Sequence, residues 1–379
     1  MHRPGGSGAF LRKINAVAVL RVLFGADVVT LREIADAAGV SRNTVEDALV
    51  SLVRSGLAEE VAPNGDDQRP IGRPAKRYRL RPEYGHVVGV DLGVYEINVL
   101  VTDLRGRKRV VRNRPLAPEA TAADRVAAAR EAIRGTVRRA GVRRSDVLAV
   151  GVATTGIVDA AGRLVRSSRL PILEGRNLAD DLAVFPNAPV IVGNDARLAA
   201  LAERWVGVAR DLDNFVNILA GRHITSSIVL DGQLFRGARG AAGEIGFLAE
   251  SGWKAALDTA AAWPEGVEET VRAAAHGDPA AVRRVDGFAG QLAVGIAAVA
   301  LTVDPECIVL SGGLSRAGDT LLEPLRRHLD SRTLFPIPLR TSELDRDAVG
   351  LGAVRVALDH VEGDLFDPHS ALLAAVLGA

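Results

Sequence analysis

Over roughly the first 80 residues, hydrophobic positions recur mainly at helical spacing. Between residues 9 and 24 the apolar side chains follow one another mostly three or four positions apart, which predicts a first helix. Thr30 and Glu33 form a capping box ahead of the segment LREIADAA, and Gly39 stands where that helix must end. Ser41 then precedes RNTVEDALVSLVRSGL, whose apolar residues form one stripe. Two short helices joined by Ala-Gly-Val-Ser predict a helix-turn-helix.

From residue 86 onward the pattern becomes one of strands. HVVGVDLG, INVLVTD and KRVVRNRP read as three consecutive strands, followed by the amphipathic helix ADRVAAAREAIRGTVRRAG and the buried strand VLAVGVATTG. A second series runs through DNFVNILA, SSIVLDG, the helix QLAVGIAAVALTV, the strand CIVLSGG and a helix from about residue 318. This alternation predicts an α/β fold, and its repetition predicts two similar lobes with a cleft between them.

Composition narrows the class of protein. A chain of 379 residues with 48% hydrophobic residues is long enough for two or three domains with substantial cores. The single cysteine, Cys307, excludes an internal disulfide framework and a cysteine-cluster zinc site. We find no run close to the roughly 20 apolar residues of a membrane span and no secretory signal pattern. We therefore expect a cytoplasmic protein without a membrane partner.

The helix-turn-helix suggests an interaction with double-stranded DNA. The second helix of such a pair enters the major groove by its N-terminal residues, where Arg and Asn can each read a base edge through two hydrogen bonds. The side chains offered to DNA are Ser41, Arg42, Asn43 and Thr44. The alternative is a helix pair used only for packing, since Glu46 and Asp47 follow with the wrong charge for phosphate.

A basic segment after the second helix favours DNA binding. The net charge of the whole chain is only +1, but residues 69–81 carry six basic side chains and no acidic one. The segment reads as the return arm of a wing whose tip lies at residues 63–67. Its Gly-Arg-Pro-Ala loop would place Arg73 along a minor groove, with Lys76 and Arg77 close behind. The alternative is a solvated linker between domains.

Taken together, these features resemble the ROK family (repressor, open reading frame, kinase), and in particular its transcriptional regulators. The resemblance covers essentially the whole chain and rests on the helix-turn-helix with GRPA, GVDLG, LPILEGRNLADDL, GNDARLAALAE, GAAGEIG and CIVLSGGLS. It implies a winged helix-turn-helix domain, residues 1–82, fused to a sugar-kinase-like domain of the actin-type ATPase fold, residues 83–379. The two lobes of that domain would be residues 83–195 plus 346–379, and residues 196–345.

The resemblance implies a sugar site. Asn194 and Asp195 match the family's sugar-binding Asn-Asp pair, in which the aspartate is the kinase base, and Glu244 matches a sugar-hydroxyl ligand. Asn177, in EGRN, is expected to line the same pocket. The purely structural alternatives are that Asp195 caps the following helix and that Glu244 is a surface carboxylate after a glycine turn.

Both phosphate loops depart from the kinase pattern. The family's first loop reads Asp-x-Gly-Gly-Thr, whereas here Val94 and Tyr95 follow Asp91-Leu92-Gly93. The second loop is rich in glycine in the kinases, but LAGRHITSS keeps only Gly221 and inserts Arg222, His223 and Ile224. We therefore expect no useful ATP turnover, with Asp195 a vestigial base, and no cofactor.

The zinc site of the family is also missing from the sequence. Phe247 stands at the position of its zinc-binding histidine, and a segment without cysteine, LAESGWKAALDTAAAW, replaces the cysteine loop. We expect no metal here. Gly312 and Gly313 match the family's adenosine-side turn, but a strand-to-helix turn needs glycine for its backbone alone, and we assign them that structural role.

These expectations combine into a function. The leading hypothesis is a transcriptional regulator, most simply a repressor of sugar-related genes, that binds operator DNA as a homodimer or dimer of dimers and senses a sugar or sugar phosphate by cleft closure. A second hypothesis is a dimeric DNA-binding repressor that senses no ligand, because the zinc site and its histidine are lost. A third is an active sugar kinase with a DNA-binding domain, which the retained Asp195 favours and the phosphate loops oppose.

Overall fold

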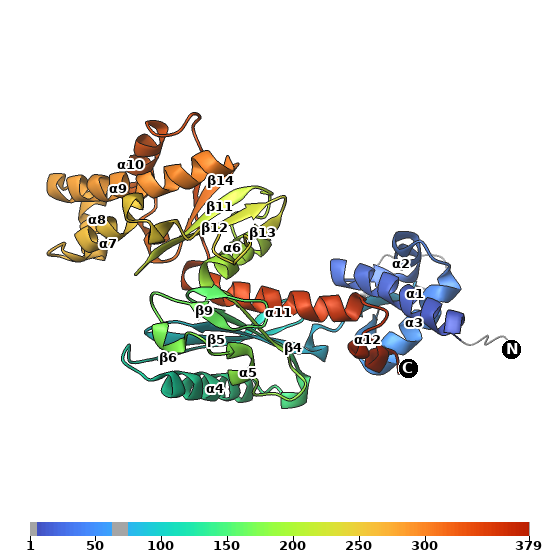
Figure 1. Ribbon diagram of the computed structural model, residues 1–379. Coiled ribbons are helices and arrows are strands. Elements are labelled where there is room, and N and C mark those ends of the chain that lie inside the picture. The colour runs from blue at the N-terminus through green and yellow to red at the C-terminus, as the bar shows by residue number, and fades with distance from the viewer. Residues whose placement is uncertain (1–5, 63–74, 379) are drawn as a thin grey trace.

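Figure 1 shows the computed structural model of the chain, which describes residues 6–62 and 75–378. A small helical domain lies beside the first of two α/β lobes, and the second lobe stands on the far side of that first lobe. The α/β class and the two-lobed arrangement predicted from the sequence are confirmed.

The N-terminal domain is a winged helix-turn-helix. Its helices and strands are α1 (Gly6–Gly25), β1 (Val29–Thr30), α2 (Leu31–Ala38), α3 (Arg42–Ser55), β2 (Ala58–Val61) and β3 (Arg77–Leu80), and the sheet order is β1-β3-β2. The predicted capping box is present, because the Glu33 amide donates to Thr30 Oγ1 at 3.2 Å and the Thr30 amide donates to Glu33 Oε2 at 2.7 Å. Gly39 ends α2 in the left-handed region, at φ 67°, as expected of a helix C-cap.

The two lobes contain sheets of the same topology. The first sheet has the order β10-β7-β4-β5-β6, and the second has the order β13-β12-β11-β14-β15. In each lobe three antiparallel strands are followed by two parallel ones, because short turns can join antiparallel neighbours whereas parallel neighbours need a longer crossover. The repeat seen in the sequence therefore corresponds to a repeated fold.

The elements of the first lobe, in chain order, are the 3₁₀ turn η1 (Pro82–Tyr84), β4 (His86–Leu92), β5 (Glu96–Asp103), β6 (Lys108–Pro115), α4 (Ala122–Arg139), η2 (Arg144–Asp146), β7 (Val147–Thr154), β8 (Ile157–Val158), β9 (Leu164–Arg166), η3 (Pro171–Leu173), α5 (Leu178–Asp181) and β10 (Val190–Asn194). Helix α6 (Asp195–Trp205) follows β10 and lies between the lobes.

Those of the second lobe are β11 (Phe215–Ala220), β12 (Ile224–Leu230), β13 (Gln233–Phe235), η4 (Ile245–Phe247), η5 (Ala249–Ser251), α7 (Trp253–Ala261), α8 (Val267–Ala275), α9 (Pro279–Val303), β14 (Cys307–Ser311), η6 (Gly313–Ala317), α10 (Asp319–Asp330) and β15 (Leu339–Thr341). The chain then returns to the first lobe through η7 (Asp345–Asp347), α11 (Ala348–Phe366) and α12 (Ala371–Leu377).

Helix α9 is apolar over an unusual length. By length and composition it could cross a membrane, with a mean hydropathy of 1.5. The expectation that no segment comes close to a membrane span is therefore too strong for this helix. It packs beneath the second sheet and against α7, α8 and α10, and 56% of the apolar window is buried. Its apolar character is therefore accounted for by the core of the second lobe.

Helix α11 connects α6 with the DNA-binding domain. It lies on β4 and β7 and crosses α6 so closely that a Cβ added at Gly352 would be 1.7 Å from the Leu198 carbonyl oxygen. At its other end Phe366 packs edge-on against Phe24 of α1, with ring centroids 5.3 Å apart. One rigid helix thus contacts both α6 and the helix-turn-helix (Figure 1).

The last helix joins the DNA-binding domain rather than the lobes. Leu373 and Val376 of α12 are buried in the same hydrophobic core as α1, α3 and α11. The segment after residue 346, which the sequence analysis assigns to the first lobe, therefore ends on the helix-turn-helix. The core is continuous from the DNA-binding domain into the first lobe.

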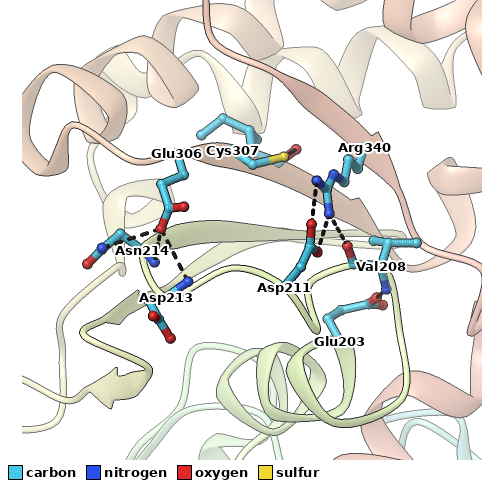
Figure 2. Close-up of polar contacts among 9 residues, drawn as sticks. Glu203, Val208, Asp211, Asp213, Asn214, Glu306, Cys307 and Arg340 are labelled. Atoms are coloured by element: carbon cyan, nitrogen blue, oxygen red, sulfur yellow. Dashed lines mark hydrogen bonds and ion pairs between the residues drawn. The ribbon is translucent and has the colours of Figure 1, made fainter.

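The segment between α6 and β11 is fixed to the second lobe by polar contacts (Figure 2). The backbone amides of Asp213 and Asn214 donate to Glu306 Oε1 at 3.2 and 2.7 Å. Arg340 pairs with Asp211 at 2.7 Å and also donates to the Val208 carbonyl. The C-terminal end of α6 is consequently tied to β14 and β15.

Candidate functional site

The expected sugar-binding pair lies where β10 ends and α6 begins. Asn194 caps α6, because its Oδ1 accepts from the Arg197 amide at 3.1 Å, while its Nδ2 donates to the Gly156 carbonyl at 3.0 Å. The suggestion that Asp195 is the cap is wrong, since Asp195 is the first residue inside the helix. A cap must have extended backbone with its side chain turned back to the first turn, and Asn194 meets that condition at φ −73° and ψ 138°.

Three carboxyl groups from different elements interact electrostatically at the start of α6. Burial above all, with the charges of Asp91 and Glu244, raises the pKa of Asp195 to about 7, although the hydrogen bond from the Ala196 amide opposes the shift. Burial likewise raises the pKa of Asp91 to about 6, partly offset by the hydrogen bond from Asn98. Carboxyl groups that titrate near neutral pH can both donate to and accept from hydroxyl groups.

Arg197 links Asp195 with Glu244. The buried guanidinium donates to the Gly240 carbonyl, in the loop that leads to Glu244. Burial lowers the pKa of Arg197, and the Glu244 carboxylate partly offsets this by raising it. Burial raises the pKa of Glu244, and the charge of Arg197 partly offsets that shift by lowering it. The four groups therefore form one electrostatically coupled set of acids and a cation, suited to a neutral ligand rich in hydroxyl groups.

The position of Glu244 is set by a close approach of backbones. Gly243 adopts φ 89°, and a Cβ there would be 2.4 Å from the Ser226 carbonyl oxygen. Ser226 Oγ also donates to the Gly243 carbonyl at 2.6 Å. Only glycine allows this contact, which explains the Gly-Glu dipeptide of the motif.

Two members of the set were not predicted as ligand contacts. The sequence analysis assigns Asp91 only to a phosphate loop. Its position at the end of a buried strand is the signal that points to a functional carboxylate. Arg197 lies one helical turn from Asn194, and that spacing was the available signal.

Asn177 has a structural role in the fold. Its Oδ1 accepts from the amides of Ala179 and Asp180 at 3.1 and 3.4 Å and so caps α5. In the part of the chain that is described, none of its hydrogen bonds reaches Asp195 or Glu244. Its place in a ligand pocket stays a prediction.

The phosphate-loop glycines use their amides within the protein. The Gly93 amide donates to the Glu96 carbonyl at 3.0 Å, and the Gly221 amide donates to the His223 carbonyl at 2.8 Å. Gly312 adopts φ 80°, and a Cβ there would lie 2.7 Å from the Ala220 carbonyl oxygen. This contact gives the backbone reason for Gly312 that the sequence analysis favours.

Phe247, at the position of the family's zinc-binding histidine, is 79% exposed at the end of η4. Over residues 6–62 and 75–378, no group of three or more His, Cys, Asp or Glu side chains is placed to hold a metal ion. Beside Phe247 and Glu244, η4 and α9 line an open, mainly apolar pocket of about 510 Å³.

The expected DNA-contacting residues lie at the N-terminus of α3. Ser41 caps the helix by accepting from the Thr44 amide at 3.2 Å, and the hydroxyl groups of Ser41 and Thr44 are 2.8 Å apart. Arg42 and Asn43 are exposed on the first turn. Ser41 and Thr44 therefore shape the helix start, while Arg42 and Asn43 extend outward.

The wing is described on both sides of its tip. Lys76 pairs with Glu60 of β2 at 3.2 Å, and Arg77 begins β3. Arg73, with the rest of the Gly-Arg-Pro segment, lies outside the described residues. An exposed Lys–Glu pair is weak, so a phosphate group can compete for Lys76.

Comparison with known proteins matches both parts of the chain. Residues 87–252 and 247–357 match the ROK family, and residues 14–62 match the IclR helix-turn-helix domain. A xylose repressor of Bacillus subtilis (strain 168) is 21% identical over 380 residues, which cover 93% of this chain and 96% of the relative.

Solved structures show the same fold. A ROK family transcriptional regulator, described as a homologue of the E. coli MLC protein, aligns with a TM-score of 0.72 at 20% identity over 98% of this chain and all of its own. The ROK hexokinase of Thermus thermophilus aligns with a TM-score of 0.58 at 30% identity over 73% of this chain and 99% of its own. With family matches covering most of the two lobes and a helix-turn-helix ahead of them, this chain belongs to the ROK family.

Proposed function

We propose that the chain is a DNA-binding transcriptional regulator, acting as a repressor of sugar-related genes, whose kinase-like lobes bind a sugar or sugar derivative. The observation that supports this most is the continuous core joining the helix-turn-helix to the first lobe. The relative named xylose repressor aligns over both parts, whereas the hexokinase covers 73% of the chain.

The effector site is the cluster around Asp195. Asp91 and Asp195 offer both donors and acceptors for sugar hydroxyl groups, Glu244 offers acceptors, and Asn194 fixes the helix start that carries Asp195. Because α6 crosses α11, and α11 contacts α1, a ligand that changes the position of α6 can change that of the DNA-binding domain. Such coupling requires different effector affinities in the two arrangements.

We propose further that the lobes do not transfer phosphate. The turn amides of Gly93 and Gly221 are used internally, and Tyr95 and Arg222 stand where the kinases have small residues. A phosphate cradle needs several free amides pointing into one concave surface. An assay of ADP release over a panel of hexoses and pentoses should give no turnover; turnover that Asp195→Asn abolishes would establish the kinase hypothesis instead.

The test of the regulator is fluorescence anisotropy on DNA from directly upstream of the gene, at fixed salt, with a panel including xylose, hexoses and their phosphates. We expect specific binding that one compound weakens. Specific binding that no compound changes, together with no thermal shift, would favour the ligand-insensitive repressor. Failure to prefer this DNA over scrambled DNA would count against the proposal as stated.

The same proposal predicts the oligomeric state of the protein and the spacing of the half-sites in its operator. A homodimer, or a dimer of dimers, would present two α3 helices to half-sites about 34 Å apart or a multiple of that distance. Light scattering after size exclusion measures the state directly, and footprinting on the operator measures the spacing.

A further inference from the structure

A contact between side chains bridges the two lobes at the turns that correspond to the phosphate loops of the kinases. The guanidinium carbon of Arg222 lies 4.2 Å from the centroid of the Tyr95 ring. Tyr95 belongs to the turn between β4 and β5 in the first lobe, and Arg222 to the turn between β11 and β12 in the second. Since a cation within about 6 Å of an aromatic ring centroid is attracted by the ring, this contact holds the two turns together.

The turn that carries Tyr95 is anchored by a buried arginine. Arg125, only 1% exposed, donates to the Val94 carbonyl at 3.0 Å and to the Pro118 carbonyl at 2.6 Å. The Tyr95 carbonyl accepts from the Leu116 amide at 2.7 Å. A buried guanidinium needs such acceptors, so the backbone around Tyr95 is held rigidly on the first lobe.

The turn that carries Arg222 is also held in place by backbone hydrogen bonds. Ala220 and Ile224 face each other in the ladder between β11 and β12, and the amide of Gly221 closes the turn by donating to the His223 carbonyl. Burial, and then the charge of Arg169, lower the pKa of His223 to about 4, so its ring is neutral at neutral pH. Arg222 is therefore the cation that this turn presents to Tyr95.

In a second contact between the lobes, the first lobe supplies the cation and the second lobe supplies the aromatic ring. Arg166 of β9, in the first lobe, lies 5.7 Å from the ring centroid of Phe247 in the second. Tyr95, Arg222 and Phe247 are all positions at which the chain departs from the kinase pattern. Residues that replace phosphate and zinc ligands thus make contacts from one lobe to the other.

We propose that Tyr95 and Arg222 form a clasp between the lobes that closes the nucleotide end of the cleft without a nucleotide and sets how readily the effector end opens. Arg166 and Phe247 add a weaker contact of the same kind. Only the consequence for operator binding rests on the proposed function; the clasp itself is a property of the two lobes.

The clasp can be measured as a distance between lobes. Arg144→Cys on the first lobe and Glu268→Cys on the second provide exposed sites for spin labels, whereas native Cys307 is buried and shielded from the label. Pulsed electron resonance then compares the clasp-intact protein with Tyr95→Leu, Arg222→Gln and the double variant. Tyr95→Phe, which keeps the ring, and Arg283→Gln, at an exposed arginine of α9, are the matched controls.

We expect each single clasp variant to raise the ratio of open to closed lobes about two- to five-fold, the range for one partly exposed cation–π contact. The double variant should open no further than either single variant, because both changes remove the same contact. Distances in both single variants that match the clasp-intact protein, or additive opening in the double variant, would overturn the clasp.

The regulatory consequence is tested with the same variants, without labels, on operator DNA. Opening of the lobes together with a shift of about two-fold or more in operator affinity, or in the effector concentration that releases DNA, supports it. If the lobes open while both quantities stay unchanged in a protein that binds DNA normally, the regulatory role is refuted and the clasp is only structural. Failure of the wild type to bind DNA would instead refute the proposed function and leave the distance result standing.

Discussion

The crossing of α6 and α11 makes a quantitative prediction at Gly352. A Cβ at this position would lie 1.7 Å from the Leu198 carbonyl oxygen and 2.2 Å from the carbonyl carbon, so Gly352→Ala must push two helix backbones apart. The contact is with backbone and cannot be relieved by a rotamer change. Overpacking of this kind costs about 1–3 kcal/mol and sometimes more, against a helix-propensity gain of about 1 kcal/mol. The difference is a net loss of up to about 2 kcal/mol, and because the overlap is severe we expect a loss near that upper value.

Gly363 of the same helix is the matched control. It is exposed, and a Cβ there would meet nothing within 4 Å, so Gly363→Ala should stabilise the protein by about 0.5–1 kcal/mol. Urea unfolding followed by circular dichroism gives both changes at one pH and temperature. Midpoints that move in opposite directions support the packing argument. A Gly352→Ala midpoint at or above that of the wild type would refute it.

Three further predictions concern the cleft, the DNA surface and the C-terminal helix. Burial chiefly raises the pKa of Asp195 from 3.8 to about 7, so the stability contributed by its protonated form is present below about pH 4 and is lost as the pH rises through 7. In Asp195→Asn this part of the decline of Tm should be absent, while the part that comes from the raised pKa of Asp91, between about pH 4 and 6, should remain. Arg42→Ala should weaken operator binding by about 1–3 kcal/mol and relax the preference at one base pair. Arg73→Ala should instead weaken binding to all sequences and lower the slope of the binding constant against salt concentration, on logarithmic scales, by about 1. Anisotropy titrations in which both variants match the wild type would contradict the winged-helix assignment. Leu373→Ala leaves a cavity in the core shared by α12 and the helix-turn-helix, and thermal unfolding should show a loss of stability of about 2–5 kcal/mol. A change at an exposed residue of α12 should cost little, but Leu372 does not serve as that control because it packs against the same core.

Much of the secondary structure could be predicted from the sequence, because its signals are local. The capping box of Thr30 and Glu33, the glycine at Gly39 and the alternating strands each depend on residues a few positions apart. The repeated strand series likewise predicted two lobes, and two sheets of one topology are what the structure contains. Asn194, Asp195 and Glu244 could be proposed because short motifs surround them.

Contacts between residues distant in the chain follow from the tertiary structure alone. Asp91 joins Asp195, Arg222 meets Tyr95, and α12 returns to the helix-turn-helix, although none of these pairs is close in sequence. Local propensity and periodicity carry no information on such pairs; they result from how closely the lobes and helices pack. Local signals therefore account for the elements and the family motifs, whereas the packing of backbones at positions such as Gly352 fixes which side chains come together around α6 and how α6 is joined to the DNA-binding domain.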